Sequence, residues 1–234
     1  MTLTPASRAP TFRIPTWNTI DTLLLDMDGT LLDLHYDNQF WNFRVPEFYA
    51  QTHQLSLEQA RQIVHQNFRQ VAGTLDWYCL DYWQTTLALP IRELKRQFVD
   101  LIQVRDDVPP FLREAREAGI RIVLVTNAHP DALALKNEYT ELATWCDEQY
   151  STHQFGACKE DQRLWQRLQK HVDFDPQRSL FIDDGEPILD AAREFGIAQL
   201  LGVANPDSQL PFKTFQRHSS FDNYAALRPI IKTT

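Results

Sequence analysis

Apolar residues along the chain follow two different periods, and the change from one to the other predicts the fold. The run from Ile20 to Met27 is rich in leucine and ends at an acid and a glycine, which is typical of a short buried strand. From about residue 38 to 105, apolar residues instead recur every three or four positions, as in the segment 58–71. An aromatic-rich segment, 75–87, continues this pattern. The stretch therefore predicts several helices and no strand.

Beyond Pro109 and Pro110 the pattern alternates between strand and helix. Helices are predicted at 111–119, 131–142, 160–170 and 187–196, strands at 120–126, 148–151, 178–183 and 198–203, and a last helix near 224–231. Strands that alternate with helices of this length form a parallel sheet with right-handed crossovers. The sequence therefore predicts an α/β fold of the doubly wound type.

The helical stretch interrupts this sheet directly after its first strand, which suggests an insertion that folds separately. We expect a core made of residues 1–35 and 106–234, and a helical cap, or lid, made of residues 36–105. Open α/β sheets bind ligands at the carboxyl ends of their strands. The residues that carry the chemistry are therefore expected where strands end.

Composition and charge exclude several classes of protein. The chain has 234 residues, 43% of them apolar, and a net charge of -8, so a nucleic-acid partner, which needs clustered Lys and Arg, is not expected. No apolar run is long enough to span a membrane, and we expect a cytoplasmic protein. Cys79, Cys146 and Cys158 are widely spaced, so the sequence indicates neither a disulfide framework nor a zinc site.

The first candidate site follows the first predicted strand, where Asp26 and Asp28 are separated by one residue. Residues two apart in an extended chain face the same side, so both carboxylates can reach one site, one as nucleophile and one as general acid and base. Two such charges about 4 Å apart repel by roughly 4 kcal/mol at an effective dielectric constant of 20, so a cation is expected beside them. A calcium loop also begins Asp-x-Asp, but Gly29 and Asp37 do not fit its later positions.

Three further strand ends carry polar residues, although each has an ordinary structural explanation as well. Thr126 and Asn127 could hold phosphate oxygens, but these residue types are also common in loops. Lys159 could neutralise nearby acids or be merely solvated. Asp183 and Asp184 could cap the following helix or bind Mg²⁺. The order of the four groups along successive strands favours a shared phosphate and metal site.

These motifs, DMDGT, VTN, the lysine of ACKED, and IDD, resemble the four motifs of the haloacid dehalogenase superfamily, in the same order. The resemblance implies a Rossmann-like parallel sheet of strand order 5-4-1-2-3 with an inserted helical cap, a Mg²⁺ cofactor and a phosphoaspartyl intermediate. It also implies roles for the candidate residues. Asp26 would be the nucleophile and a metal ligand, Asp28 the acid and base and a metal ligand, Thr126, Asn127 and Lys159 the phosphate-binding groups, and Asp184 with Asp183 the remaining metal site.

Longer segments, such as LDWYCLDYW, STHQFGACKEDQRLW and FIDDGEPILDAAREFGI, resemble one branch of the superfamily, the bacterial GMP/IMP nucleotidases. The branch implies a phosphoric monoester hydrolase that acts on purine nucleoside 5′-monophosphates, as a monomer or weak homodimer. A phosphatase or phosphomutase for small sugar phosphates or phosphoglycolate remains the alternative. In the predicted cap, the rings of residues 77, 78, 82 and 83 could stack on a purine, although most of them are expected to pack in a core.

Overall fold

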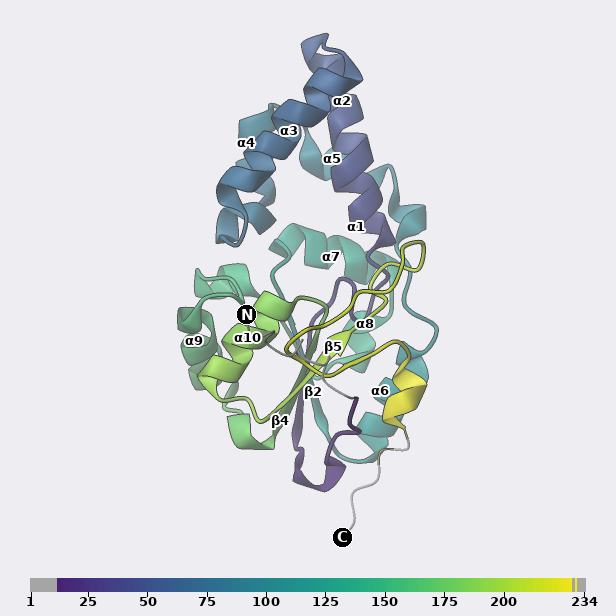
Figure 1. The fold of residues 1–234 in the computed structure, drawn as a ribbon, viewed down its shortest axis with the longest axis vertical. Helices are drawn as coiled ribbons and strands as arrows, with labels where there is room; N and C mark the ends of the chain where they lie inside the picture. The colour runs from purple at the N-terminus through teal and green to yellow at the C-terminus, as the bar shows by residue number, and fades with distance from the viewer. Residues whose placement is uncertain (1–11, 229, 231–234) are drawn as a thin grey trace, which may run out of the picture.

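The centre of the computed structural model, which describes residues 12–228 and 230, is a six-stranded sheet whose paired strands all run parallel (Figure 1). The strand order is β3-β2-β1-β4-β5-β6. The strands are β1 (Thr22–Leu25), β2 (Arg121–Thr126), β3 (Glu148–Ser151), β4 (Ser179–Asp183), β5 (Gln199–Val203) and β6 (Ser220–Phe221). Read from the other edge, the first five give the predicted order 5-4-1-2-3, which is confirmed. The two-residue β6 is too short to leave a pattern in the sequence.

Helices cover both faces of the sheet, because alternate residues of each strand point to opposite sides. Leu23 and Leu25 of β1 pack in one apolar cluster with residues of α6 (Val108–Glu117), α8 (Leu142–Trp145) and the 3-10 turn η7 (Tyr224–Leu227). Leu24 packs in a second cluster with residues of α9 (Gln162–Val172) and α10 (Glu186–Phe195). Above the sheet in Figure 1 lies α7 (Pro130–Tyr139), which follows β2 in the chain.

A group of helices is inserted between β1 and β2, as predicted, and stands at the upper end of the molecule in Figure 1. It contains α1 (His35–Gln39), the π-helical turn η2 (Phe40–Arg44), α2 (Val45–His53), α3 (Leu57–Val71), the 3-10 turn η3 (Leu75–Tyr78), α4 (Leu80–Leu87), α5 (Ile91–Arg96) and the 3-10 turn η4 (Val99–Leu101). These helices share their own apolar cluster, built around Val64, Phe68 and Trp83. The predicted division at residues 36 and 105 remains a prediction.

The aromatic segment 75–87 does not form the single helix that its pattern suggests. Cys79 is extended, with φ -87° and ψ 114°, and separates η3 from α4. The carbonyl oxygen of Trp77 accepts a hydrogen bond of 2.7 Å from the indole of Trp83, so it is engaged outside a helical ladder. The helical pattern predicted for residues 75–87 is therefore divided at Cys79 into a 3-10 turn and an α-helix.

Two other predicted helices have different bounds in the structure. The helix expected at 131–142 ends at Tyr139, because Thr140 is extended, and α8 follows separately. The helix expected near 224–231 is one 3-10 turn, and residues 229 and 231–234 lie outside the described part of the chain, as do residues 1–11.

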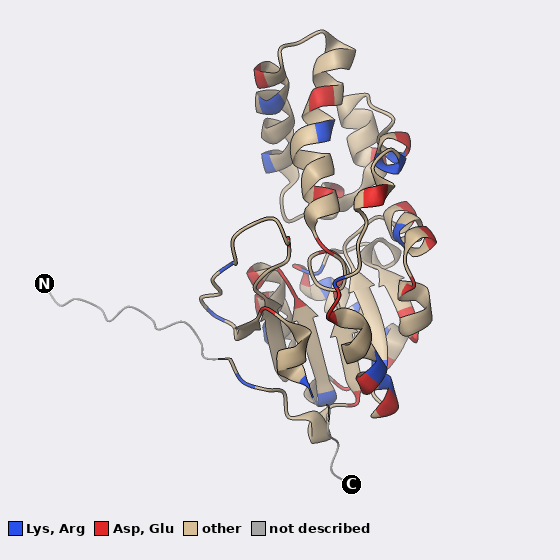
Figure 2. Cartoon of the chain, turned by 90° about the vertical axis from the view of Figure 1, so that its right-hand side faces the viewer, with Lys and Arg blue, Asp and Glu red and all other residues tan. Residues whose placement is uncertain are grey.

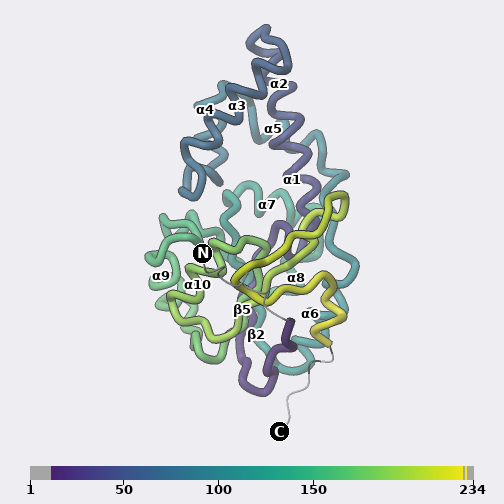
Figure 3. Tube along the Cα trace, in the orientation of Figure 1, coloured from purple at the N-terminus to yellow at the C-terminus, as the bar shows by residue number. Residues whose placement is uncertain are grey.

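The segment that follows β5 connects the core to the insertion. In Figure 3 this segment passes beside α1, and its Pro206 oxygen accepts a hydrogen bond of 2.8 Å from the Leu34 amide. The Asp207 carboxylate accepts a second, of 2.7 Å, from the Asn38 side chain. The start of the insertion is thus anchored to a core loop.

Charged residues are distributed over both parts of the molecule. In Figure 2, Lys and Arg are interspersed with Asp and Glu on the helices of the insertion and of the core. Over the described residues, no helix has the length and apolarity that crossing a membrane requires.

Candidate active site

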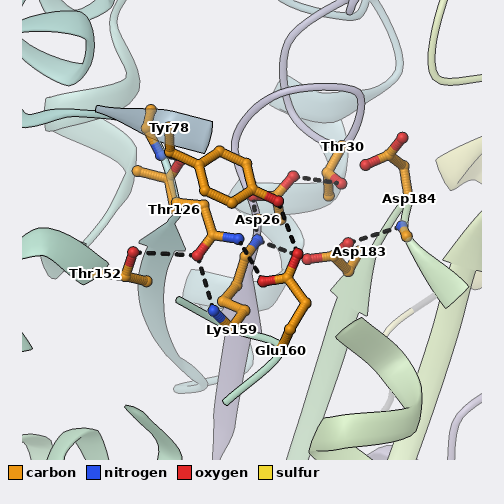
Figure 4. A network of polar contacts seen from close by, with 12 residues as sticks. Asp26, Thr30, Tyr78, Thr126, Thr152, Lys159, Glu160, Asp183 and Asp184 are labelled. Atoms are coloured by element: carbon orange, nitrogen blue, oxygen red, sulfur yellow. Dashed lines mark hydrogen bonds and ion pairs between the residues drawn. The ribbon is translucent and has the colours of Figure 1, made fainter. Parts of the chain in front are cut away.

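The four predicted motifs meet at the carboxyl edge of the sheet, although they are far apart in the sequence (Figure 4). Asp26 directly follows β1, and its amide donates to the Ile182 oxygen of β4 at 3.0 Å. Thr126 and Asp183 are the last residues of β2 and β4. Lys159 lies in the loop between β3 and α9. The parallel register of β2, β1 and β4 is what brings these groups to one edge.

Lys159 connects the two carboxylates at the base of the site. Its Nζ atom lies 2.5 Å from Asp26 Oδ1 and 2.6 Å from Asp183 Oδ2, and all three side chains are buried. Burial alone would lower the pKa of Lys159, but the two carboxylates raise it above its ordinary range. The lysine is therefore a permanent cation beside the predicted nucleophile.

The donor set of the site fits a magnesium ion. Asp26, Asp183 and Asp184 offer carboxylate oxygens that all lie within 4.8 Å of one another. Burial raises the pKa of Asp183 to about 8, the Asp26 and Asp184 carboxylates add to this rise, and the Lys159 cation opposes it. Buried acids that crowd together in this way are stabilised by a divalent cation, and Mg²⁺ prefers such hard oxygen ligands.

The two acids of the fourth motif are not equally free to bind a metal. The carboxylate of Asp183 accepts from Lys159 through Oδ2 and from the Gly185 amide, at 2.8 Å, through Oδ1. Asp184 instead pairs with Lys213, a lysine whose side chain is 44% exposed and can be displaced, at 2.6 Å. Asp184 is therefore the better candidate for a direct ligand, and Asp183 for a residue that positions Lys159.

Gly29 allows the first motif to lie against the fourth. Its φ of +79° lies in the left-handed region, and a Cβ atom there would be 2.9 Å from Pro206 Cβ and 3.0 Å from Asp184 Cγ. Only glycine provides both the turn and the close approach. The DxDG pattern thus has a steric reason as well as a chemical one.

Asp28 belongs to a second group of charges that the sequence did not reveal, and we call this group the bridging network. It consists of Asp28, Lys136 of α7, Asp37 of α1 and Lys95 of α5. Lys136 pairs with Asp28 and, at 2.5 Å, with Asp37 Oδ2, whose other oxygen lies 2.8 Å from Lys95 Nζ. Both lysines are buried. The network therefore runs from the first motif into the helical insertion.

The bridging network sets the protonation of its two acids in opposite directions. Burial raises the pKa of Asp28 to about 6, the nearby Asp37 and Asp26 carboxylates add to this rise, and Lys136 opposes it. Burial would also raise the pKa of Asp37, but Lys136 and Lys95 together hold it below its ordinary range. Asp28 can thus gain and lose a proton near neutral pH, as a general acid and base must.

The residues of the second motif are mostly engaged with the protein itself. Thr126 is buried, and its hydroxyl accepts from the Ala128 amide at 3.0 Å, which leaves the hydroxyl proton available to a ligand. The Asn127 side chain accepts from the Lys159 amide at 2.9 Å and from Thr152 at 3.1 Å, and donates to Glu160 at 3.1 Å. These contacts indicate that Asn127 orients the lysine loop.

A cavity of about 300 Å³ extends from these polar groups into the insertion. Its walls there are aromatic, made of Trp41, Phe68, Trp77, Tyr78 and Trp83. The Tyr78 hydroxyl donates to Glu160 at 2.8 Å and so closes one side of the cavity between insertion and core. Of the four aromatic residues singled out in the sequence, only Tyr82 does not line the cavity.

Lys136, Lys95 and Glu160 are the residues of the site that sequence reasoning missed. The one available signal for Lys136 was a lysine within an apolar helical segment, next to Leu133 and Leu135, where a charge needs a partner. Such a signal does not identify the partner.

Comparisons with known proteins are consistent with this geometry. Residues 20–196 match the family model of the haloacid dehalogenase-like hydrolases. The chain is 46% identical over 213 residues to the GMP/IMP nucleotidase YrfG of Escherichia coli, which covers 91% of this chain and 96% of that protein, and the nucleotidase of Shigella flexneri gives the same values.

Solved structures agree in fold. A HAD phosphatase from Thermococcus onnurineus superposes with a TM-score of 0.74 at 19% identity, over 89% of this chain and 96% of that one. A HAD family enzyme from Bacteroides thetaiotaomicron, solved with magnesium and inorganic phosphate, has a TM-score of 0.58 at 15% identity, over 79% of this chain and 94% of that one.

Proposed function

Because the chain belongs to the haloacid dehalogenase-like hydrolases, we propose that it is a Mg²⁺-dependent phosphatase that hydrolyses purine nucleoside 5′-monophosphates through a phosphoaspartyl intermediate. The enzyme class is a phosphoric monoester hydrolase, given this family and the likeness to two nucleotidases. The observation that carries the proposal is the set of oxygens from Asp26, Asp183 and Asp184 within 4.8 Å of one another, beside the Lys159 cation.

In the first half of the reaction, an Asp26 oxygen attacks phosphorus and the bond from phosphorus to the ribose oxygen breaks. Asp28 transfers its proton to that oxygen, so the nucleoside leaves as a neutral alcohol. Its pKa of about 6 allows it to hold the proton in a useful fraction of molecules at neutral pH. Lys159 remains charged throughout and stabilises the phosphoryl oxygens.

In the second half, Asp28, now ionised, accepts a proton from a water molecule that attacks phosphorus. The bond between phosphorus and the Asp26 oxygen breaks, which releases phosphate and restores the free carboxylate. A bound Mg²⁺, held by Asp26, the Asp28 backbone and Asp184, would supply positive charge next to the phosphoryl oxygens. The Thr126 hydroxyl proton is positioned to donate to one of them.

The aromatic part of the cavity is the proposed site for the base. Purines stack well on aromatic rings, and Trp41, Trp77 and Tyr78 line the side of the cavity that belongs to the insertion. A cavity of about 300 Å³ lies at the lower end of the range for small-molecule sites. We propose that residues 36–105 act as a cap that closes over the nucleotide, and that the enzyme works in the cytoplasm.

The test is a phosphate-release screen of the purified protein with Mg²⁺ and with EDTA. Its panel contains GMP, IMP, AMP, pyrimidine nucleotides, small sugar phosphates and phosphoglycolate. We expect release from GMP and IMP at least tenfold faster in kcat/KM than from the other compounds, and no release with EDTA. Preference for a sugar phosphate or phosphoglycolate would reject the nucleotide assignment, and full activity in EDTA would reject the metal.

A further inference from the structure

A second cluster of side chains that could bind a metal lies at the junction of the insertion and the core, and one of its members, His129, lines the same cavity as the carboxylate site. Cys79 lies between η3 and α4 of the insertion, His129 precedes α7, and His153 belongs to the 3-10 turn η5 (Thr152–Phe155) after β3. The Cys79 sulfur and one ring nitrogen of each histidine lie within 4.8 Å of one another, and each side chain is half-buried. Three segments that are distant in the sequence thus meet at one point.

The ring of His153 has a nitrogen without a partner. Its Nε2 atom is buried and makes no hydrogen bond within the part of the chain that the structure describes. A buried nitrogen in this state costs stability unless a ligand occupies it.

His129 is oriented by acids on both sides of its ring. Its Nε2 atom lies 3.4 Å from Asp81 Oδ2, and its Nδ1 atom lies 3.6 Å from Asp131 Oδ2. Nδ1 also accepts a hydrogen bond of 3.2 Å from the Asp131 amide at the start of α7, so Nε2 is the nitrogen that remains for a metal ion. Asp81, whose side chain is 67% exposed, also supplies a carboxylate at the same place.

We propose that Cys79, His129 and His153 bind a Zn²⁺ ion that ties the helical insertion to the core, with Asp81 or water as the fourth ligand. Sulfur and imidazole ligands favour Zn²⁺ over Mg²⁺, which prefers the oxygen ligands of the carboxylate site. Binding converts the Cys79 thiol to a thiolate and releases its proton to solvent.

A zinc ion at this cluster would fix the insertion to the core. Bonds of about 2.0 to 2.3 Å in a tetrahedral site place ligand atoms roughly 3.5 Å apart, so any pair of these atoms that lies near the upper limit of 4.8 Å would have to move closer. Cys79 adjoins Tyr78 of the cavity wall, and His129 lies two residues after Asn127. If the proposed function holds, an ion here slows the opening of the cap and inhibits turnover. Metal binding itself does not depend on that function.

Cadmium absorption tests the site without any need for turnover. A thiolate bound to Cd²⁺ gives a charge-transfer band in the ultraviolet, and excess Mg²⁺ keeps the carboxylate site occupied. We expect one Cd²⁺ per chain with this band, displaced by Zn²⁺, in the wild-type protein and in the controls Cys146→Ala and His65→Gln. In Cys79→Ser the band should be lost, and in His153→Gln affinity should fall at least tenfold.

Two results would overturn the site: a wild-type protein that shows no band, or a Cys79→Ser protein that keeps it. The wild-type measurement alone decides the matter if a variant does not fold.

Hydrogen exchange tests whether zinc stabilises the contact between the insertion and the core. Zn²⁺ should slow amide exchange in residues 74–82 at least tenfold in the wild-type protein and in Cys146→Ala, and leave it unchanged in Cys79→Ser. If zinc binds but the amide exchange rate in residues 74–82 does not change, zinc does not link the insertion to the core. Because both experiments are done without substrate, failure of the zinc site and failure of the proposed nucleotidase activity are separate results.

Discussion

The molecule contains two buried lysines that each join two carboxylates, and they differ in what they connect. Lys159 joins Asp26, which directly follows β1, and Asp183, which ends the neighbouring strand β4. Lys136 joins Asp28 of the core to Asp37 of the insertion. The chemistry is the same, but the first bridge lies within one rigid layer and the second crosses a junction.

In the proposed mechanism, the Lys159 bridge would serve catalysis, whereas the Lys136 bridge would connect the acid and base to the insertion. The partners of Lys159 are positioned by the register of β1 and β4. The Lys136 bridge instead needs α1 to lie against α7. If the insertion acts as the proposed cap, its position would therefore affect the pKa of Asp28. The following experiments test this contrast.

The largest effect is expected from Asp26→Asn, which removes the nucleophile but keeps the shape of the side chain. Turnover should fall by about 10⁴-fold or more, as it does when a covalent catalyst is removed. Phosphate release measures this, and circular dichroism checks that the variant is folded. Turnover near that of the wild-type protein would reject a covalent role for Asp26.

Lys159→Met should abolish activity and also destabilise the protein, because it leaves Asp26 and Asp183 buried without their cation. Loss of one partner of a buried ion pair costs about 3–5 kcal/mol in the free energy of unfolding. Mg²⁺ should recover part of this loss, since it neutralises the same carboxylates. Denaturant unfolding with Mg²⁺ and with EDTA gives the two values. Equal stability in both would contradict the shared site.

Lys136→Met should change the pH dependence of the reaction more than its maximum rate. Burial raises the pKa of Asp28, and the Lys136 cation opposes this rise. Without Lys136, the pKa of Asp28 should therefore rise further above 6. Asp28 then stays protonated to higher pH, so the alkaline limb of kcat/KM, where the acid is lost, should move to higher pH.

Lys95→Met is the matched control for this experiment, because Lys95 is also buried but, among the described residues, forms its one ion pair with Asp37. Lys95→Met should shift the alkaline limb of the kcat/KM profile by much less than Lys136→Met. If the two variants shift the profile equally, direct contact with Asp28 is not the cause.

The smallest effect is expected from Tyr78→Phe, which removes one hydroxyl that links the insertion to Glu160. A hydrogen bond of this kind contributes about 1 kcal/mol, so kcat/KM should fall roughly fivefold. Steady-state kinetics with GMP measure the change. Tyr82→Phe, outside the cavity, is the control and should have no effect; a similar loss in both variants would point to general loosening of the insertion.

Prediction from the sequence succeeded where a local pattern carries the information. The alternation of strands and helices predicted a parallel sheet, and the resemblance to the superfamily supplied the strand order, which is confirmed. Asp26, Asp28, Lys159, Asp183 and Asp184 were singled out by their places at strand ends and by the family motifs, and their roles remain predictions. The parallel register then requires them to share one edge of the sheet.

The sequence did not predict contacts between segments that are far apart in the chain and share no recognisable sequence pattern. Nothing near Lys136 in the sequence points to Asp37, and nothing near Cys79 points to His129 or His153. The spacing of the three cysteines gave no indication of zinc, because the proposed ligands come from three separate segments. The break at Cys79 was missed for a similar reason, since the side chain of Trp83 takes the Trp77 oxygen.

By itself the sequence determined the family, the parallel α/β core and the acids at its strand ends, because these depend on periodicity and short motifs. Only the tertiary structure decided which lysine neutralises which acid and where the insertion meets the core. The physical reason is that charges and metal ligands act over a few ångströms in space, whatever their separation along the chain. Their partners are known only once the chain has folded.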